Sequence, residues 1–93
     1  MKQPLMALRL ANHTRFVRAS TKRRINGGIS PRDYILKPPP ELQRMPVGQL
    51  LKAQRYWGDS RVQKFCRRAA VPESKPLGEL TELQRSVIVG MLG

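Results

Sequence analysis

The chain has 93 residues, and its 18 Lys and Arg outnumber 6 Asp and Glu, which gives a formal net charge of +12. This length suits one small domain with a thin hydrophobic core. A positive excess of this size destabilises the compact state by self-repulsion, and an anionic partner relieves it. Nucleic acid is therefore the first partner class to consider, with an anionic membrane surface second. No apolar run approaches the length that spans a bilayer.

The sequence lacks the residue groups that catalysis or cofactor binding requires. Cys66 is the only cysteine and His13 the only histidine, which excludes an intramolecular disulfide and argues against a zinc site. Apolar residues surround Cys66 at helical spacing, so we interpret it as a small core residue. The apolar N-terminal stretch is interrupted by Arg9 and does not resemble a signal peptide. We expect a cytoplasmic protein with no enzymatic activity, no cofactor, no metal, no membrane and no small-molecule substrate.

Residues 5–26 contain no Pro or Gly and end at Gly27-Gly28, which predicts one long helix. Met6, Leu10 and Val17 share one face of it. The basic residues of this helix that we predict to contact phosphate are Arg15, Arg18, Lys22, Arg23 and Arg24. No acidic residue accompanies them, whereas ordinary solvated helices mix both signs. Phosphate contact is therefore favoured over a merely solvated face.

Residues 29–44 predict a short helix followed by a proline-rich linker. Ser30 is expected as the N-cap, with Pro31 in the first turn and Asp33 as an acidic residue near the start. The three prolines of residues 38–40 stop this helix and predict a semi-rigid, polyproline-like spacer. A ligand for a proline-binding domain is the weaker alternative.

Residues 45–93 predict three further helices with two connections. Pro46 opens the first, which ends near residues 54–56, and its apolar face consists of Val47, Leu50 and Leu51. Gly58 makes the turn, and Asp59 is expected to cap the second helix. The second helix has a buried face of Val62, Phe65, Cys66 and Ala69 and a neighbouring basic face of Arg61, Lys64 and Arg68.

Thr81 and Gln84 have the spacing of a capping box, which predicts the start of the last helix. Its apolar residues are Leu83, Val87, Ile88, Met91 and Leu92. No alternating strand pattern and no internal repeat occur anywhere in the chain. The sequence therefore predicts an all-α fold.

The turn at Gly58 is a candidate phosphate site. A helix N-terminus presents unpaired backbone N–H groups and the positive end of the helix dipole, and a glycine lets a phosphate approach closely. Ser60 adds a hydroxyl, and Arg61 and Lys64 add charge, whereas Asp59 repels phosphate. Such an arrangement indicates contact with the nucleic-acid backbone rather than with bases.

Two aromatic residues, Tyr56 and Trp57, precede this turn. Insertion into a groove or stacking on bases is one interpretation. We favour the other, in which Trp57 packs beneath the turn between helices and Tyr56 lies at its edge.

The order of several short motifs resembles a known family. The motifs are Met45-Pro46-Val47, Leu50-Leu51, Gly58-Asp59-Ser60-Arg61-Val62, Val71-Pro72 and Leu80-Thr81-Glu82-Leu83-Gln84-Arg85. Together they resemble the actinobacterial integration host factor family, small nucleoid proteins of the helix–two-turn–helix type. They are also similar to the corresponding part of ribosomal protein S13. With the basic N-terminal helix, the resemblance covers about residues 15–91.

The resemblance implies a basic N-terminal helix or arm (residues 1–28), a linker (29–44) and a compact S13-like helix–two-turn–helix domain (45–93). It implies nucleoid association, with sequence-tolerant binding of double-stranded DNA that bends or compacts it and assists a phage integrase or another recombination protein. The family contacts phosphates through the turn and the following helix. That role carries over to Gly58, Ser60 and Arg61, with Lys64 as a neighbour on the same face. We also predict DNA contacts from Arg68, which continues this basic face, and from Lys75, which keeps a charge in the loop.

The chain departs from the family pattern in the C-terminal part. Pro76 and Gly78 stand where the family tends to have arginine, and Asp59 stands where the turn has lysine. These departures predict a weaker C-terminal contact and a divergent member, which a phage-encoded version would explain. We expect the N-terminal helix to carry more of the affinity, and the two basic clusters to touch one bent duplex or to bridge two.

Two other functions stay open at this point. An RNA-binding, S13-like protein is the first, although single-strand RNA readers usually stack bases on several aromatic residues and the five aromatics here are scattered. The second is a phage-encoded regulator that binds a host protein through its first helix and its proline linker.

Overall fold

The computed structural model describes the backbone of residues 3–93 and the side chains from residue 9 onward. Its helices are α1 (Gln3–Asn26), α2 (Arg32–Leu36), α3 (Val47–Lys52), α4 (Asp59–Ala69) and α5 (Glu82–Leu92), with 3-10 turns η1 (Pro40–Leu42) and η2 (Leu77–Glu79). Within residues 3–93, extended pairing is limited to an isolated bridge between Pro46 and Pro76. The predicted all-α fold is confirmed.

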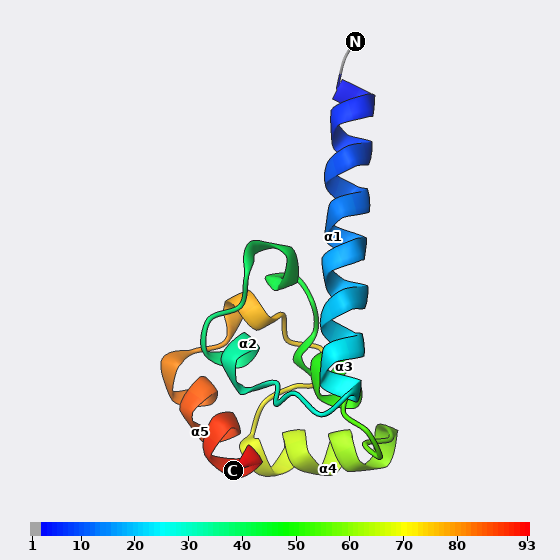
Figure 1. Ribbon diagram of the computed structural model, residues 1–93. Helices are drawn as coiled ribbons and strands as arrows, with labels where there is room; N and C mark the ends of the chain where they lie inside the picture. The colour runs from blue at the N-terminus through cyan, green and yellow to red at the C-terminus, as the bar shows by residue number, and fades with distance from the viewer. Residues whose placement is uncertain (1–2) are drawn as a thin grey trace.

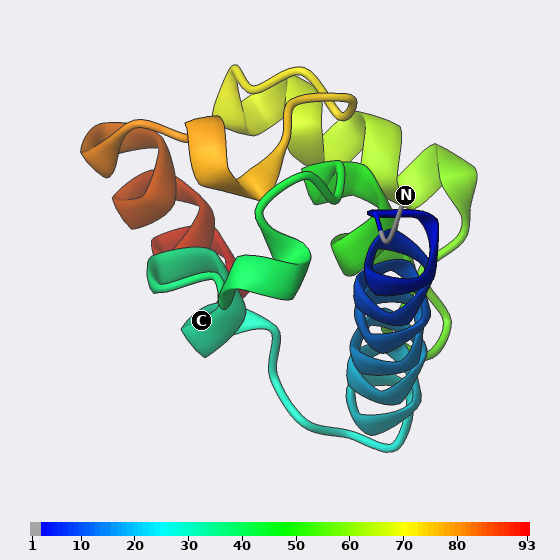
Figure 2. The same ribbon diagram turned by 90° about the horizontal axis from the view of Figure 1, so that it is seen from above.

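Helix α1 extends far beyond the rest of the molecule (Figure 1), and Figure 2 looks along this helix with the body beside it. The molecule as a whole, with α1 included, measures 48 × 27 × 21 Å along its principal axes. Leu10 is exposed because this part of α1 rises above the body, and Val17 is only half-buried. The predicted apolar face therefore contacts little, and Met6 lies outside the described side chains. Among the side chains of α1 that the structure describes, the buried ones are Thr21 and Ile25, one turn apart near the end of the helix.

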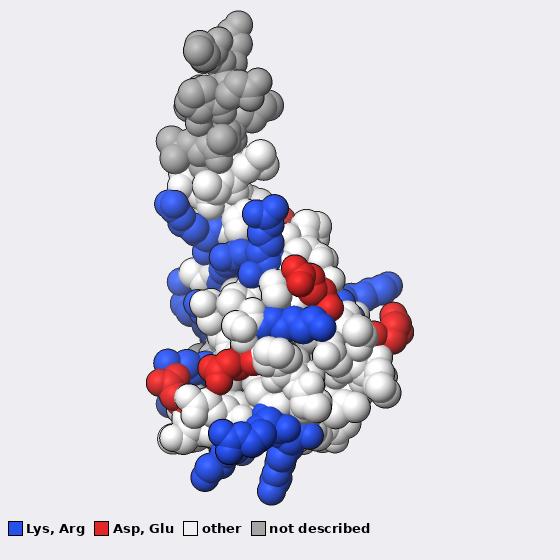
Figure 3. All heavy atoms as spheres, turned by 180° about the vertical axis from the view of Figure 1, so that it is seen from behind, with Lys and Arg blue, Asp and Glu red and all other residues white. Residues whose placement is uncertain are grey.

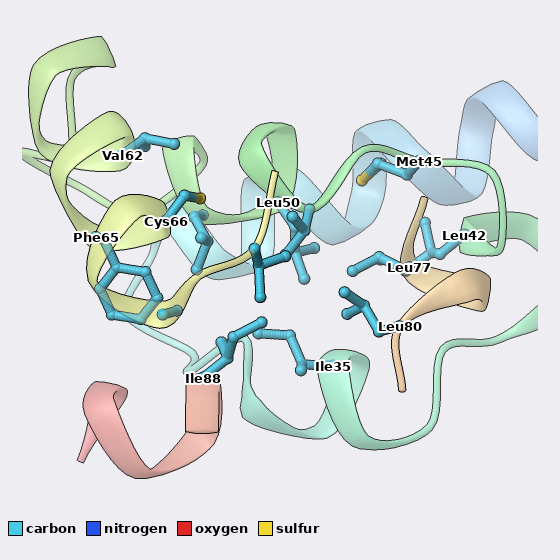
Figure 4. Packing of buried hydrophobic residues seen from close by; sticks show 14 of the residues in the cluster. Ile35, Leu42, Met45, Leu50, Val62, Phe65, Cys66, Leu77, Leu80 and Ile88 are labelled. Carbon is cyan, nitrogen blue, oxygen red and sulfur yellow. The ribbon is translucent and has the colours of Figure 1, made fainter. Parts of the chain in front are cut away.

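All three predicted segments contribute to one hydrophobic core. Figure 4 shows the part of it that comes from the linker and from residues 45–93. Its largest fully buried side chains include Ile25, Ile35, Leu42, Met45, Leu50, Leu51, Leu77 and Ile88. Each such side chain stabilises the fold by about 1.5–3 kcal/mol relative to an exposed one. The last turns of α1 and the linker are therefore required by the same core as residues 45–93.

The helix starts show which local predictions were right. Thr81 caps α5 as expected: its Oγ1 accepts from the N–H of Gln84, and the Gln84 Oε1 accepts from the N–H of Thr81. The expected cap of α2 is wrong by one residue, because Pro31 is the N-cap and no side chain caps the helix. Pro31 is buried and its ψ is 0°. Ser30 lies one residue before this N-cap, and its Oγ accepts from the N–H of Arg32.

The start of α3 packs directly against the loop that follows α4. The N–H of Val47 donates to the carbonyl of Lys75 over 2.9 Å, and the N–H of Gly48 donates to the carbonyl of Glu73 over 2.8 Å. A Cβ at Gly48 would lie 2.9 Å from both the Cβ and the carbonyl oxygen of Glu73. Only glycine fits this contact without a shift of the loop, which fixes α3 against α4.

Candidate nucleic-acid interface

The connection between α3 and α4 consists of residues 53–58. The N–H of Ala53 donates to the carbonyls of Gln49 and Leu50, and the N–H of Trp57 donates to the carbonyl of Gln54 over 3.1 Å. These bonds fold the connection into consecutive tight turns. The result is a short helix, a compact turn and an 11-residue helix α4 whose first residues face outward.

The N-terminus of α4 is open to solvent. Gly58 is its N-cap, with φ −87° and ψ −177°, and no side chain caps the helix. A Cβ at Gly58 would meet no atom within 4 Å. The N–H groups of the first turn and the positive end of the dipole are therefore accessible to an anion.

The prediction that Asp59 caps α4 is wrong. Asp59 is the first residue of the helix, and its Oδ1 lies 2.7 Å from the Nζ of Lys52 at the end of α3. Both side chains are mostly exposed, so this ion pair contributes little to stability. Its consequence is electrostatic, because Lys52 offsets the acidic charge beside the open end of α4.

A groove of about 1080 Å³ runs beside α4 toward the end of α5. It brings together four of the predicted residues, Ser60, Arg61, Lys64 and Arg68. Arg67 also lines it, and the sequence reasoning did not single out this residue. Its spacing of three residues from Lys64 was the available signal. Apolar residues such as Phe65 and Leu92 line the groove together with these basic side chains.

Arg61 is held in position by an aromatic ring. Its guanidinium carbon lies 4.4 Å from the centroid of the Trp57 ring, and Trp57 packs edge-on against Phe65 with 5.2 Å between centroids. Trp57 therefore packs beside the turn, as the favoured interpretation has it, whereas Tyr56 projects into solvent. A cation over an indole ring is attracted to its face, so the Arg61 charge is oriented while it stays exposed.

The predicted basic residues of α1 do not share one face. Arg15 and Lys22 lie seven residues apart on one side of the helix, and Arg24, nine residues from Arg15, points to the opposite side. The Nε of Arg18 donates to the carbonyl of Glu41 over 3.2 Å, so this half-buried side chain ties α1 to η1. Nearby, the Nε2 of His13 lies 3.0 Å from the Oε2 of Glu41.

A second groove, of about 710 Å³, lies between α1 and α3. Lys22 and Arg23 line it together with Lys52, which the sequence reasoning did not identify. The end of α1 therefore adjoins the α3–α4 connection. Figure 3 shows the same pattern in outline: basic side chains gather along α1 and again at the lower end of the body, over α4.

Lys75 is not among the residues that line either basic groove. This half-buried side chain donates from its Nζ to the Oε1 of Gln84 over 3.0 Å, and its carbonyl accepts from Val47. In this structure Lys75 stabilises the loop and the start of α5.

Other kinds of site find little support among the described residues. From residue 9 onward, no group of three or more His, Cys, Asp or Glu side chains could hold a metal ion. Over the described chain, no helix is both long and apolar enough to cross a membrane. Cys66 is buried, and burial raises the pKa of its thiol, with a further rise from the Glu73 carboxylate. An uncharged, enclosed thiol is a poor nucleophile.

Comparison with known proteins identifies the fold. No protein-family model and no curated protein matches the sequence. The arrangement of a long helix beside a body built on the α3–α4 pair is, however, that of a solved protein. The chain is similar to a structure described as sIHF bound to an 8-bp palindromic DNA, with a TM-score of 0.81 and 24% sequence identity, over 91% of this chain and 99% of that one. The likeness establishes a shared fold; the DNA is the ligand of that protein.

Proposed function

We propose that this protein is an architectural DNA-binding protein that contacts the backbone phosphates of duplex DNA. The observation that carries the proposal is the open N-terminus of α4, which has an uncapped first turn beside Ser60, Arg61 and Lys64. Backbone N–H groups and flanking cations are the donors that phosphate binds. The net charge of +12 supplies long-range attraction to such a polyanion.

The shared fold supports the same proposal, because the solved protein is described as bound to DNA. We further propose the role that the family resemblance implies. The protein would be a nucleoid-associated member of the integration host factor family, without enzymatic activity. It would bend or compact DNA with little sequence preference and assist an integrase or another recombination protein.

The groove between α1 and α3 is the proposed second contact. Lys22, Arg23 and Lys52 line it, and it adjoins the connection that leads to α4. One bent duplex that touches both grooves, or two duplexes bridged by one molecule, would use these charges. Arg24 points away from this groove and has no role in the proposal.

The decisive experiment is a salt titration of binding to a fluorescent duplex of unrelated sequence, with the same duplex in RNA alongside. Contact with roughly six to ten phosphates lowers the affinity by about a thousandfold or more between 50 and 200 mM salt. We expect tight, steeply salt-dependent binding that favours DNA. Preference for the RNA duplex would indicate the S13-like alternative. Absence of duplex binding at low salt by a folded protein would refute the proposal and leave a protein partner for the basic surfaces.

A further inference from the structure

Tyr56 has an unusual backbone conformation for a bulky residue. Its φ is 68°, in the left-handed region that glycine adopts without strain, and its side chain is 86% exposed. The connection between α3 and α4 requires this backbone geometry, but it does not require a large aromatic side chain. A strained residue that gains no burial is a reason to look for a function.

The surroundings of Tyr56 direct its ring away from the protein. Trp57, the next residue, packs against Phe65 and the core. The guanidinium carbon of Arg55 lies 5.9 Å from the centroid of the Tyr56 ring, so a cation accompanies the exposed aromatic. Tyr56 is two residues from Gly58, where the open end of α4 begins. The Arg55–Tyr56 pair therefore lies in the connection that leads directly into the proposed phosphate site, and Arg55 also lines a hollow beside Gly27 and Gly28 at the end of α1.

Ala70 provides a comparison within the same molecule. It also has a positive φ, 58°, but it is the C-cap of α4, and its N–H donates to the carbonyls of Arg67 and Cys66. The left-handed cap ends the helix and satisfies its last carbonyls. Ala70 carries a small side chain, as such a position favours. Tyr56 has similar backbone strain, but its side chain is a large exposed ring.

We propose that the Arg55–Tyr56 pair enters the minor groove of the duplex whose phosphates α4 contacts. This inference rests on the proposed function. The major groove, about 12 Å wide, is usually read by an inserted helix or β-ribbon, whereas one ring and one guanidinium on a projecting turn suit the minor groove, about 6 Å wide. A ring can press between base steps, and the negative potential of a narrow A·T minor groove attracts arginine.

The pair adds a shape preference to phosphate contacts that are themselves blind to sequence. Guanine carries an amino group in the minor groove, which A·T pairs lack. That group obstructs a ring lying on the groove floor. The protein is therefore expected to bind A·T-rich duplexes more tightly than G·C-rich ones, although it tolerates both.

Substitution of inosine for guanosine distinguishes minor-groove contact from major-groove contact in one experiment. An inosine·cytosine pair lacks the minor-groove amino group but presents the major-groove edge of G·C. Three fluorescent duplexes of equal length, built from A·T, G·C and inosine·cytosine pairs, are titrated with the full chain at constant salt. We expect the A·T and inosine duplexes to bind alike and roughly tenfold more tightly than G·C, a discrimination that one good base contact supplies.

Tyr56→Gly removes the ring and relieves the positive φ, so the variant is expected to fold and to bind all three duplexes as weakly as wild type binds G·C. Tyr56→Phe keeps the ring and is expected to retain the preference. Ala70→Gly is the matched control. It relieves the same kind of backbone strain at the other end of α4, and both affinity and preference should stay at the wild-type level.

Two results would overturn the inference while leaving phosphate binding intact. In the first, the inosine duplex behaves like G·C, which excludes the minor groove. In the second, Tyr56→Gly binds every duplex as wild type does, which excludes the ring as a contact. Absence of all duplex binding by wild type would instead overturn the proposed function, and with it the groove contact.

Discussion

The two helices on either side of the connection begin in opposite ways. The first N–H groups of α3 are buried, and those of Val47 and Gly48 donate to the carbonyls of Lys75 and Glu73. The N-terminus of α4 is exposed and has no side-chain cap. Both starts carry a glycine within two residues, yet one start builds the core and the other is free to meet a ligand. Loop carbonyls, and not the helix sequence, decide which N-terminus can bind an anion.

The glycines themselves show the difference. At Gly48 an added Cβ would lie 2.9 Å from the Glu73 backbone, whereas at Gly58 it would lie in open space. Gly48 is thus required by packing. Gly58 has an ordinary negative φ, so its small size is not required by the fold and would instead serve the proposed phosphate contact. Substitutions at the two positions should therefore separate stability from binding.

Gly48→Ala is the change with the largest expected effect. Overpacking costs 1–3 kcal/mol, and loss of the two loop hydrogen bonds would add to this, against about 1 kcal/mol gained from the higher helix propensity of alanine. We expect a net loss of about 2 kcal/mol in the free energy of unfolding, measured by urea denaturation.

Gly58→Ala is the matched control for Gly48→Ala. An alanine N-cap lacks a capping group, so we expect a loss below about 1 kcal/mol together with weaker DNA binding, because the methyl group lies where a phosphate approaches. Equal stability losses at the two positions would show that the contrast between the helix starts is wrong.

Arg61→Ala tests the open helix start directly. The residue lies beside the first turn of α4, and Trp57 orients it. Loss of one phosphate contact should weaken binding about tenfold on all duplexes and reduce the salt dependence by roughly one unit of slope. Arg32→Ala, which removes the same charge from the exposed surface of α2, should change affinity far less. A changed sequence preference at unchanged overall affinity would contradict a phosphate role for Arg61.

Lys22→Ala measures how much the groove between α1 and α3 contributes to DNA affinity. Lys22 lines the groove with Lys52, while its neighbour Arg24 points to the other side of α1. Because this groove lacks an open helix end, we expect a smaller loss, about threefold, by fluorescence anisotropy. This reverses the expectation from the sequence that the N-terminal helix carries more of the affinity. Arg24→Ala should leave the affinity almost unchanged. If both variants bind alike, the cluster on α1 acts only through net charge and not as a contact surface.

Local sequence spacing predicted the parts of the fold that depend on neighbours along one helix. The buried face of α4 and the capping box of α5 follow from residues three or four apart, and both are found as predicted. Leu83 did not follow its apolar pattern: it is 74% exposed because α5 contacts the body along only one side. Helical periodicity identifies an apolar residue, but only the neighbouring elements determine whether it is covered.

The candidate site was predictable in composition but not in arrangement. The basic face of α4 follows from spacing, and the structure assembles it into one groove. The pairing of Asp59 with Lys52, the bond from Arg18 to Glu41 and the role of Lys75 in the α5 cap depend on residues brought together by the fold. A long flexible side chain pairs with whichever partner the fold brings close to it. Sequence spacing alone does not show which residues these are.

The smallest expected effect concerns the buried start of α3 and the loop that packs against it. Glu73, whose carbonyl accepts from α3, also raises the pKa of the buried Cys66 thiol beyond the rise caused by burial. As pH increases past the ordinary thiol range, the unfolded chain loses this proton before the folded protein does, so the free energy of unfolding falls. Below that range the protonated Cys66 thiol makes its full contribution to the free energy of unfolding.

We expect unfolding temperatures between pH 7 and 10.5 to fall more steeply for wild type than for Cys66→Ala, since all other groups titrate in both. Glu73→Gln keeps the carbonyl that accepts from Gly48 and should show an intermediate slope. Parallel curves for the three proteins would mean that the thiol is not enclosed and that the loop does not close the start of α3 as tightly as the structure indicates.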